Sequence, residues 1–176
     1  FPGNLPITLS VCGFIAFLPQ HLAIMSSMNN DSLAAVWMIL GLWLIVRRTT
    51  PWVIGIVVGL AFLTKATVYI LAIVATVTAV QRVQKREVRL SYLWQLFAPA
   101  LFMGTAWWLR NTLVYGWPDF LGLINHSEVV VGQPRTLDWL DKFGELDFSR
   151  RFIQTTFNSF WGQFGWMAVP MKLVVF

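Results

Sequence analysis

Residues 51–80 read PWVIGIVVGLAFLTKATVYILAIVATVTAV, a run of thirty residues in which Lys65 is the only formally charged side chain. Uncharged, apolar runs of about 20 residues are typical of helices that cross a membrane. A single helix made of the whole run would be about 45 Å long, whereas each half would form a helix of about 22 Å. The run therefore predicts either one overlong membrane helix or two short ones.

The basic residues on both sides of this run favour two helices. Arg47 and Arg48 precede it, and the loop that follows it carries Glu87 among four basic residues, Arg82, Lys85, Arg86 and Arg89. Loops rich in Lys and Arg lie on the cytoplasmic side of a membrane, so an even number of crossings must separate these two loops. We therefore expect a hairpin with arms at about 51–64 and 66–80, broken at 64–67, with Lys65 at its outer tip.

The composition excludes a water-soluble globular protein. Of the 176 residues, 57% are hydrophobic and 12% are charged, against about 25% charged in an average soluble domain. The net charge of +5 does not indicate a nucleic-acid partner, because the basic residues form short clusters between apolar runs. The single cysteine, Cys12, excludes a disulfide framework or a cysteine-based metal site within the chain.

Working outward from the central run, we expect further spans at about 5–28, 32–46 and 90–111, so that 1–114 forms a transmembrane domain. Residues 115–151 are expected to form an outer polar loop, in which six acidic residues face four basic ones. In 152–176 we expect an interfacial helix and the start of a further span, since apolar residues recur there at helical spacing: Ile153, Phe157, Phe160, Trp161 and Phe164.

The predicted fold class is all-α, a polytopic transmembrane helical bundle with short broken helices and an interfacial amphipathic helix. Apolar residues at both ends favour an internal piece of a longer polytopic protein.

The polar residues at membrane depth are the candidates for function, because ionisable groups there are costly. We expect them to converge on the outer half of the bilayer: His21, Asn29, Asn30, Asp31, Lys65 and Arg110. In one interpretation Asp31 and Lys65 simply neutralise each other. In the other, Lys65 and Arg110 bind the phosphate of a lipid-linked donor, and Asp31, His21 and Asn30 organise the site.

The metal requirement is left open by the sequence. Asp31, His126 and Glu128 are candidate ligands for a divalent metal cofactor, but His126-Ser127-Glu128 is a weak motif that suits a solvated loop at least as well. His21, on an apolar helix, suits a hydrogen-bonded core residue more often than a ligand. The catalytic residue stays unassigned at this point.

Several short stretches are similar to a known family. They are residues 19–27 (PQHLAIMSS), 29–34 (NNDSLA), 59–66 (GLAFLTKA), 109–111 (LRN), 115–118 (YGWP) and 160–167 (FWGQFGWM). Together they resemble the polytopic glycosyltransferases of the GT-C class, in particular the branch that contains the protein mannosyltransferases, the aminoarabinose transferase of lipid A and their bacterial relatives. The resemblance extends over most of the chain.

This resemblance implies transfer of a sugar from a polyprenyl-phosphate donor to a lipid, protein or glycan acceptor at the outer face of a bacterial plasma membrane. Asp31 matches the acid that opens the second short helix of the family, and Lys65 matches the lysine near the donor phosphate. The principal catalytic acid of the family lies in the first outer loop, upstream of this chain's first residue, so we do not expect it here. Trp117 stands where many relatives carry an acid.

The implied partners are membrane lipid, the polyprenyl-phosphate donor, and the remaining helices of the same chain or of a membrane complex. A second hypothesis is a non-catalytic membrane subunit that keeps this fold and serves as a scaffold in a larger complex. A transporter is a weaker third hypothesis, since broken helices also mark transporter sites but no inverted repeat is visible.

Overall fold

The computed structural model of the chain describes residues 3–27, 29–130, 135–164 and 169–170. Within these ranges the chain is helical apart from one pair of two-residue strands, which confirms the predicted all-α class. The helices belong to two compact units, one made of residues 30–131 and the other of residues 1–29 and 132–176.

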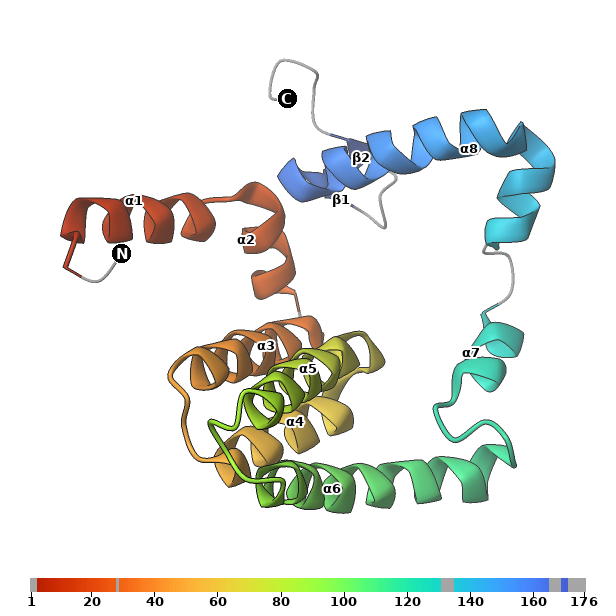
Figure 1. The fold of residues 1–176 in the computed structure, drawn as a ribbon. Helices are drawn as coiled ribbons and strands as arrows, with labels where there is room; N and C mark the ends of the chain where they lie inside the picture. The colour runs from red at the N-terminus through yellow and green to blue at the C-terminus, as the bar shows by residue number, and fades with distance from the viewer. Residues whose placement is uncertain (1–2, 28, 131–134, 165–168, 171–176) are drawn as a thin grey trace. The chain divides into compact units, whose positions relative to one another are not determined.

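The unit of residues 30–131 is a bundle of four helices followed by a short fifth (Figure 1). Helix α4 packs most extensively against α6 and also against α3, while α5 contacts the other three. The core consists of small and branched apolar side chains, among them the fully buried Ile54, Val58, Leu71 and Leu96. The elements in order are α3 Asp31–Val46, α4 Pro51–Thr64, the 3-10 helix η1 Ala66–Tyr69, α5 Ile70–Gln84, α6 Ser91–Tyr115 and α7 Leu123–Val129.

Two glycines on one face of α4 allow its close contact with α6. A Cβ at Gly55 would overlap the backbone carbonyl oxygen of Leu96, and a Cβ at Gly59 would lie 2.8 Å from the sulfur of Met103. Residues four apart lie on the same helix face, and small residues at this spacing let two helix backbones approach. The missing side chains at Gly55 and Gly59 therefore let α4 pack closely against α6.

The break between α4 and α5 falls within the predicted range. Helix α4 ends at Thr64, and Lys65 has extended backbone angles, φ −163° and ψ 139°. The chain then turns through η1 into α5. The two arms are therefore separate helices, and α5 extends to Gln84, beyond the predicted residue 80.

The helices differ in whether they are long and apolar enough to span a membrane. Among the described residues, one helical run, Ala66–Gln84, is long and apolar enough to cross a bilayer. Helices α3 and α4 are apolar but shorter. Helices α1 (Leu5–Ala16) and α2 (Pro19–Ser26) qualify only when they are taken together. The structure thus supports association with a membrane through at least this run.

The other unit contains α1 Leu5–Ala16, α2 Pro19–Ser26 and α8 Thr136–Trp161, with the antiparallel strands β1 Gln163–Phe164 and β2 Val169–Pro170. Its parts meet where α1 and α2 join. The rings of Phe14 and Trp161 lie edge to face at 6.2 Å, and the Gln163 N–H donates to Gln20 Oε1 at 3.1 Å.

The helices of the structure differ from the predicted segments in three places. The expected span at 5–28 is two helices bent by 61°, because Pro19, which begins α2, disfavours helical angles at Leu18. Part of the expected polar loop at 115–151 is helical, as α7 and the first half of α8. The helix that we expected to start at 152 begins at Thr136, where the Asp138 carboxylate accepts the Arg135 N–H at 2.7 Å and caps it.

Two further differences concern helix ends. Helix α8 bends at Gly144, where φ is 73°, and ends at Trp161. Its expected continuation through 165–167 and the start of a further span at 171–176 lie outside the described residues. Helix α6 runs to Tyr115, past the predicted residue 111, and ends there because Gly116 adopts a φ of 86° that other residues rarely take.

Candidate functional site

Asp31 and Lys65 form an ion pair between the first turn of α3 and the break after α4. The backbone break gives Lys65 this position, because an extended residue at the end of α4 carries its side chain toward the start of α3. The pair is half-buried, with 32% of the Lys65 side chain and 39% of the Asp31 side chain exposed. Both charges therefore remain reachable from solvent or by a ligand.

Two hydrogen bonds at Thr64 hold the same junction together. Asn30 Nδ2 donates to the Thr64 carbonyl at 3.0 Å, and Trp37 Nε1 donates to Thr64 Oγ1 at 3.0 Å. The structure thus brings together three of the predicted site residues, Asn30, Asp31 and Lys65. Thr64 and Trp37 position them and were not predicted.

Arg110, on α6, lies in an aromatic frame. Its Nη1 donates to Asn111 Oδ1 and to the Tyr115 hydroxyl, each at 3.1 Å. The guanidinium carbon is 5.4 Å from the ring centroids of both Trp107 and Tyr115, within the range of cation–π attraction. Among the residues that the structure describes, no carboxylate pairs with Arg110, so its positive charge is uncompensated by an ion pair.

Aromatic contacts place the Arg110 turn at the same end of the bundle as the Lys65 break. Trp108 Nε1 donates to the Tyr69 hydroxyl at 3.1 Å, and the Tyr69 hydroxyl donates to the Phe62 carbonyl at 3.1 Å. Tyr69 closes η1, which begins directly after Lys65, and Trp108 lies two residues before Arg110. The two predicted phosphate-binding cations therefore share one end of the bundle.

A cavity of about 270 Å³ lies beside Arg110. It is lined by the partners of Arg110, namely Trp107, Asn111 and Tyr115, and by polar side chains of α7, Asn125 and His126. Buried Asn111 also donates from Nδ2 to the Phe120 carbonyl at 3.1 Å, which fixes the chain that leads into α7. The cavity thus combines aromatic faces with amide and imidazole groups next to a cation.

Asp119 holds α7 in place. It is buried, and its two carboxylate oxygens accept the backbone N–H groups of Ile124 at 3.0 Å and of Asn125 at 2.8 Å. Burial acts to raise the pKa of Asp119, but backbone N–H groups of residues 122–125 donate to the carboxylate and outweigh burial, so that its pKa is lowered. Asp119 therefore acts as a charged cap of the first turn of α7.

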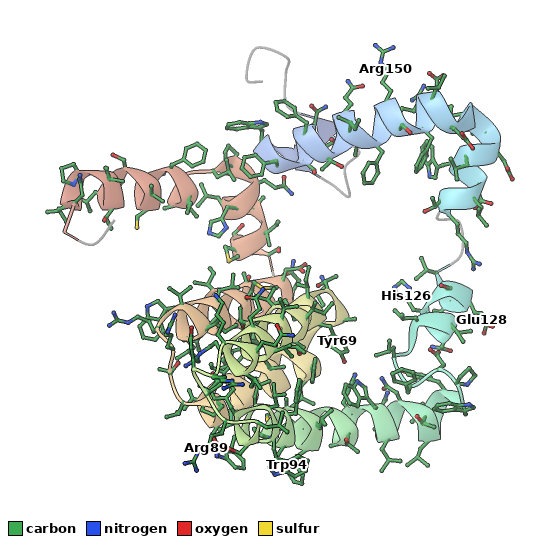
Figure 2. All side chains as sticks on the ribbon, viewed as in Figure 1. Tyr69, Arg89, Trp94, His126, Glu128 and Arg150 are labelled. Carbon is green, nitrogen blue, oxygen red and sulfur yellow. The ribbon has the colours of Figure 1, made fainter. Side chains whose placement is uncertain are left out.

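The remaining predicted site residues do not join the Asp31–Lys65 pair. His126 lines the cavity beside Arg110, whereas Glu128 lines a different cavity, and Figure 2 shows them on different sides of α7. His21 lies on α2, in the other compact unit. Among the described residues no group of three His, Cys, Asp or Glu side chains is placed to hold a metal, so a divalent metal stays a prediction.

Sequence reasoning missed the residues that surround Arg110. The signal was present at Trp107, because residues three or four apart lie on the same face of a helix, as Trp107, Arg110 and Asn111 do. Asp119 was counted only as one acid of a polar loop.

The chain was compared with models of protein families, with curated proteins and with solved structures. None of the three comparisons finds a match, so the resemblance to the GT-C class stays a prediction from the sequence.

Proposed function

We propose that the chain belongs to a multi-pass membrane glycosyltransferase of the bacterial plasma membrane, which transfers a sugar from a polyprenyl-phosphate donor at the outer face. The observation that carries the proposal is the placement of Lys65 and Arg110 at one end of an apolar bundle. Lys65 is held by Asp31, and Arg110 has no carboxylate partner within the part of the chain that the structure describes. The acceptor is a lipid, protein or glycan.

Multi-pass insertion is supported by the outer faces of the bundle. Large apolar side chains point away from the core on three helices: Ile39 is 65% exposed, Ile73 is 64% exposed and Phe102 is 82% exposed. Exposed apolar surface of this extent is unfavourable in water and favourable in lipid. Helices α3 to α6 therefore suit four crossings in which α3 and α4 are short.

Binding of a donor phosphate is supported by the charges at this end. The phosphate of the donor carries a negative charge, as the Asp31 carboxylate does, and its free oxygens accept charge-assisted hydrogen bonds, so it can compete for the ammonium of Lys65. The guanidinium of Arg110 offers planar, bidentate donation to the same class of group. Asp31 would then keep Lys65 in place before the donor arrives, and Asn30 holds the turn.

The cavity beside Arg110 suits the sugar or acceptor part of the reaction. Trp107 and Tyr115 offer flat faces, and Asn125 and His126 offer polar groups that fix orientation. No residue of the chain is assigned as the catalytic base, and the roles proposed for His21 and for a metal rest on the sequence alone.

A scaffold subunit without activity is the second candidate. It is favoured by α8, whose apolar side chains are exposed along the helix, with Leu146 at 89%. Such a face suits a protein partner as well as a membrane surface.

The proposal is tested by measuring the transfer of radiolabelled sugar from a polyprenyl-phosphate donor. The assay uses membranes that contain matched amounts of each protein variant. Wild type is compared with Lys65→Ala, with Asp31→Ala and with the double variant. We expect at least about a tenfold loss of transfer in both variants that lack Lys65, because a charge-assisted contact to phosphate is lost. Arg89→Ala, which removes an exposed charge in the loop between α5 and α6, is the matched control.

The double variant separates a ligand role from a structural one. If the pair only neutralises two charges, removal of both side chains leaves no unpaired charge, and transfer returns toward the wild-type level. If Lys65 binds the donor, the double variant stays as inactive as Lys65→Ala. Absence of transfer by the wild type would favour the scaffold.

A further inference from the structure

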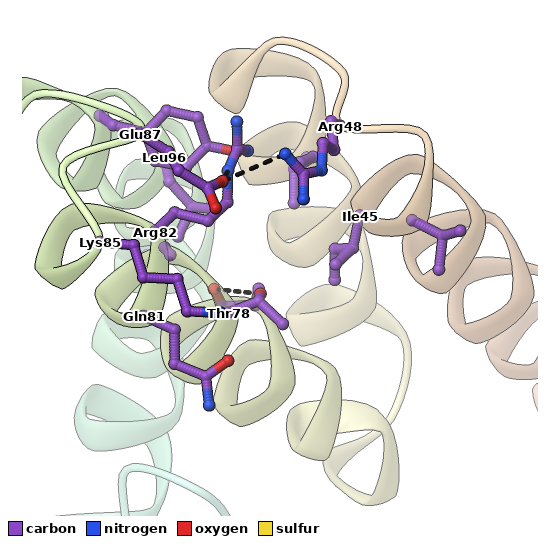
Figure 3. Close-up of a pocket in the computed structure, with 13 residues that line it drawn as sticks. Ile45, Arg48, Thr78, Gln81, Arg82, Lys85, Glu87 and Leu96 are labelled. Atoms are coloured by element: carbon purple, nitrogen blue, oxygen red, sulfur yellow. Dashed lines mark hydrogen bonds and ion pairs between the residues drawn. The ribbon is translucent and has the colours of Figure 1, made fainter.

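A second charged cavity lies at the opposite end of the bundle from Lys65. Its volume is about 260 Å³, and it opens where the loop after α3 and the loop after α5 meet (Figure 3). Its polar rim is made of Arg48, Arg82, Lys85 and Glu87. Its walls are apolar side chains of α3, α4, α5 and α6, among them Ile45, Ile54, Ala79 and Leu96.

The positive charges at this rim exceed the negative ones. The Glu87 carboxylate lies between two cations, with Oε2 at 3.1 Å from Arg48 Nη1 and at 3.5 Å from Arg82 Nε. The Arg82 Nε atom is buried and makes no hydrogen bond with any residue in the described ranges. Lys85 adds a third cation to the rim, which therefore has three positive charges and one negative charge. The rim therefore favours a further anion.

Arg82 is held ready for such a ligand. Its Nη1 donates to the Tyr92 hydroxyl at 3.0 Å, and its guanidinium carbon lies 4.9 Å from the Tyr92 ring centroid. Both contacts restrict the side chain before anything binds, and this restriction lowers the entropic cost of binding.

We propose that this cavity binds the phosphate of an anionic phospholipid headgroup. The apolar walls and the neighbouring Val46, which lines the cavity and is 79% exposed, give the lipid's acyl chains a continuous surface. A free phosphate ion would use the cations but not this surface. In the bound state the phosphate takes the place of the Glu87 carboxylate between Arg48 and Arg82. The inference rests on the proposed multi-pass insertion, which places this end at the cytoplasmic leaflet, but it does not depend on sugar transfer.

Native mass spectrometry of the detergent-purified protein tests the proposal by counting bound phosphatidylglycerol molecules. Phosphatidylcholine, a lipid without net charge, is the control ligand. We expect phosphatidylglycerol to bind in preference. Arg82→Gln and Lys85→Gln should each weaken its binding by about tenfold, as expected for the loss of one charge-assisted contact. Arg89→Gln removes the same charge from the same loop outside the cavity, and it should change binding by less than about twofold.

Glu87→Gln provides a test with the opposite sign. It removes the internal competitor, so phosphatidylglycerol should bind more tightly than to the wild type. If Glu87 only holds the two loops together, this variant binds less tightly, and the proposal is wrong. Lys85→Gln alters an exposed side chain, so its result stands even if Arg82→Gln fails to fold.

Two other results would overturn the lipid assignment. If Arg89→Gln loses as much affinity for phosphatidylglycerol as the two cavity variants do, the lipid is attracted to the basic loop in general and does not bind at a defined site. Full competition by inorganic phosphate at similar concentration would mean a site for the free ion. Because these measurements need neither donor nor transfer, failure of the glycosyltransferase proposal leaves their outcome unaffected.

Discussion

Arg48 and Glu87 form an ion pair, with 3.1 Å between Nη1 and Oε2, although 39 residues separate them in the sequence. This contact joins the loop after α3 to the loop after α5, so the two basic loops lie at the same end of the bundle. The chain leaves this end through α4, turns at Lys65 and returns through α5. The contact is what a hairpin requires, and a single helix over 51–80 would separate the two loops.

The hairpin predicts how introduced cysteines react. In a Cys12→Ser background, cysteines at Thr49 and Gln84 should both resist a membrane-impermeant maleimide on intact cells, whereas a cysteine at Thr67 should be labelled. All three should react after permeabilisation. Removal of Cys12 is needed because it is exposed.

Labelling at 49 and 84 from opposite sides would contradict the hairpin. It would also place Lys65 near the middle of the bilayer, at a cost of about 2.5 to 3.5 kcal/mol on insertion scales. The proposed phosphate site would then be lost.

Close packing of α4 on α6 predicts an order of stability among glycine variants. Gly55→Ala should destabilise most, by about 1 to 3 kcal/mol, because the added Cβ meets a backbone carbonyl that cannot move alone. Gly59→Ala should cost less, since the atoms nearest to the added Cβ belong to the flexible side chain of Met103, and the backbone of Ala100 lies farther away, at 3.3 Å. Thermal unfolding in detergent measures both.

Gly13→Ala is the control for helix propensity. A Cβ at Gly13 meets no atom within 4 Å, so this variant should be neutral or stabilised by up to about 1 kcal/mol. Equal midpoints for the variants at 13 and 55 would show that α4 and α6 do not pack closely in the membrane protein.

The capping role of Asp119 predicts a dependence on acid. Its pKa is lowered in the folded chain, so its stabilising contribution is complete above the ordinary carboxyl pKa and is lost as the pH falls through the lowered value. Wild type should therefore be more stable than Asp119→Asn near pH 6, and the difference should vanish toward about pH 2. Thermal midpoints across this range measure it.

Glu128→Gln removes an exposed carboxylate of the same helix and is the matched control. A difference between wild type and Asp119→Asn that does not change with pH would mean that shape, and not charge, makes Asp119 a cap.

The helical class and most helix breaks could be predicted because their causes are local. Long apolar runs favour helices, Pro51 starts α4, and the lone charge at Lys65 marks the end of that helix. Pro19 carried the same kind of information, since it begins α2 after the bend. The first half of α8 was expected to be a loop because it is polar. In the structure this helix begins where the Asp138 carboxylate caps it.

Asp31, Lys65 and Arg110 could be named as candidates from the sequence, because they are charged residues in an apolar chain. The packed helices were needed to show that Asp31 pairs with Lys65, that aromatic rings frame Arg110, and that Glu87 lies between Arg48 and Arg82. The physical reason is that each of these contacts depends on how side chains are oriented once the helices have packed. The Asp31–Lys65 and Arg48–Glu87 pairs join residues more than thirty positions apart, and their geometry depends on the packing of α3 against α4 and α5, which no local pattern of charge or hydropathy specifies.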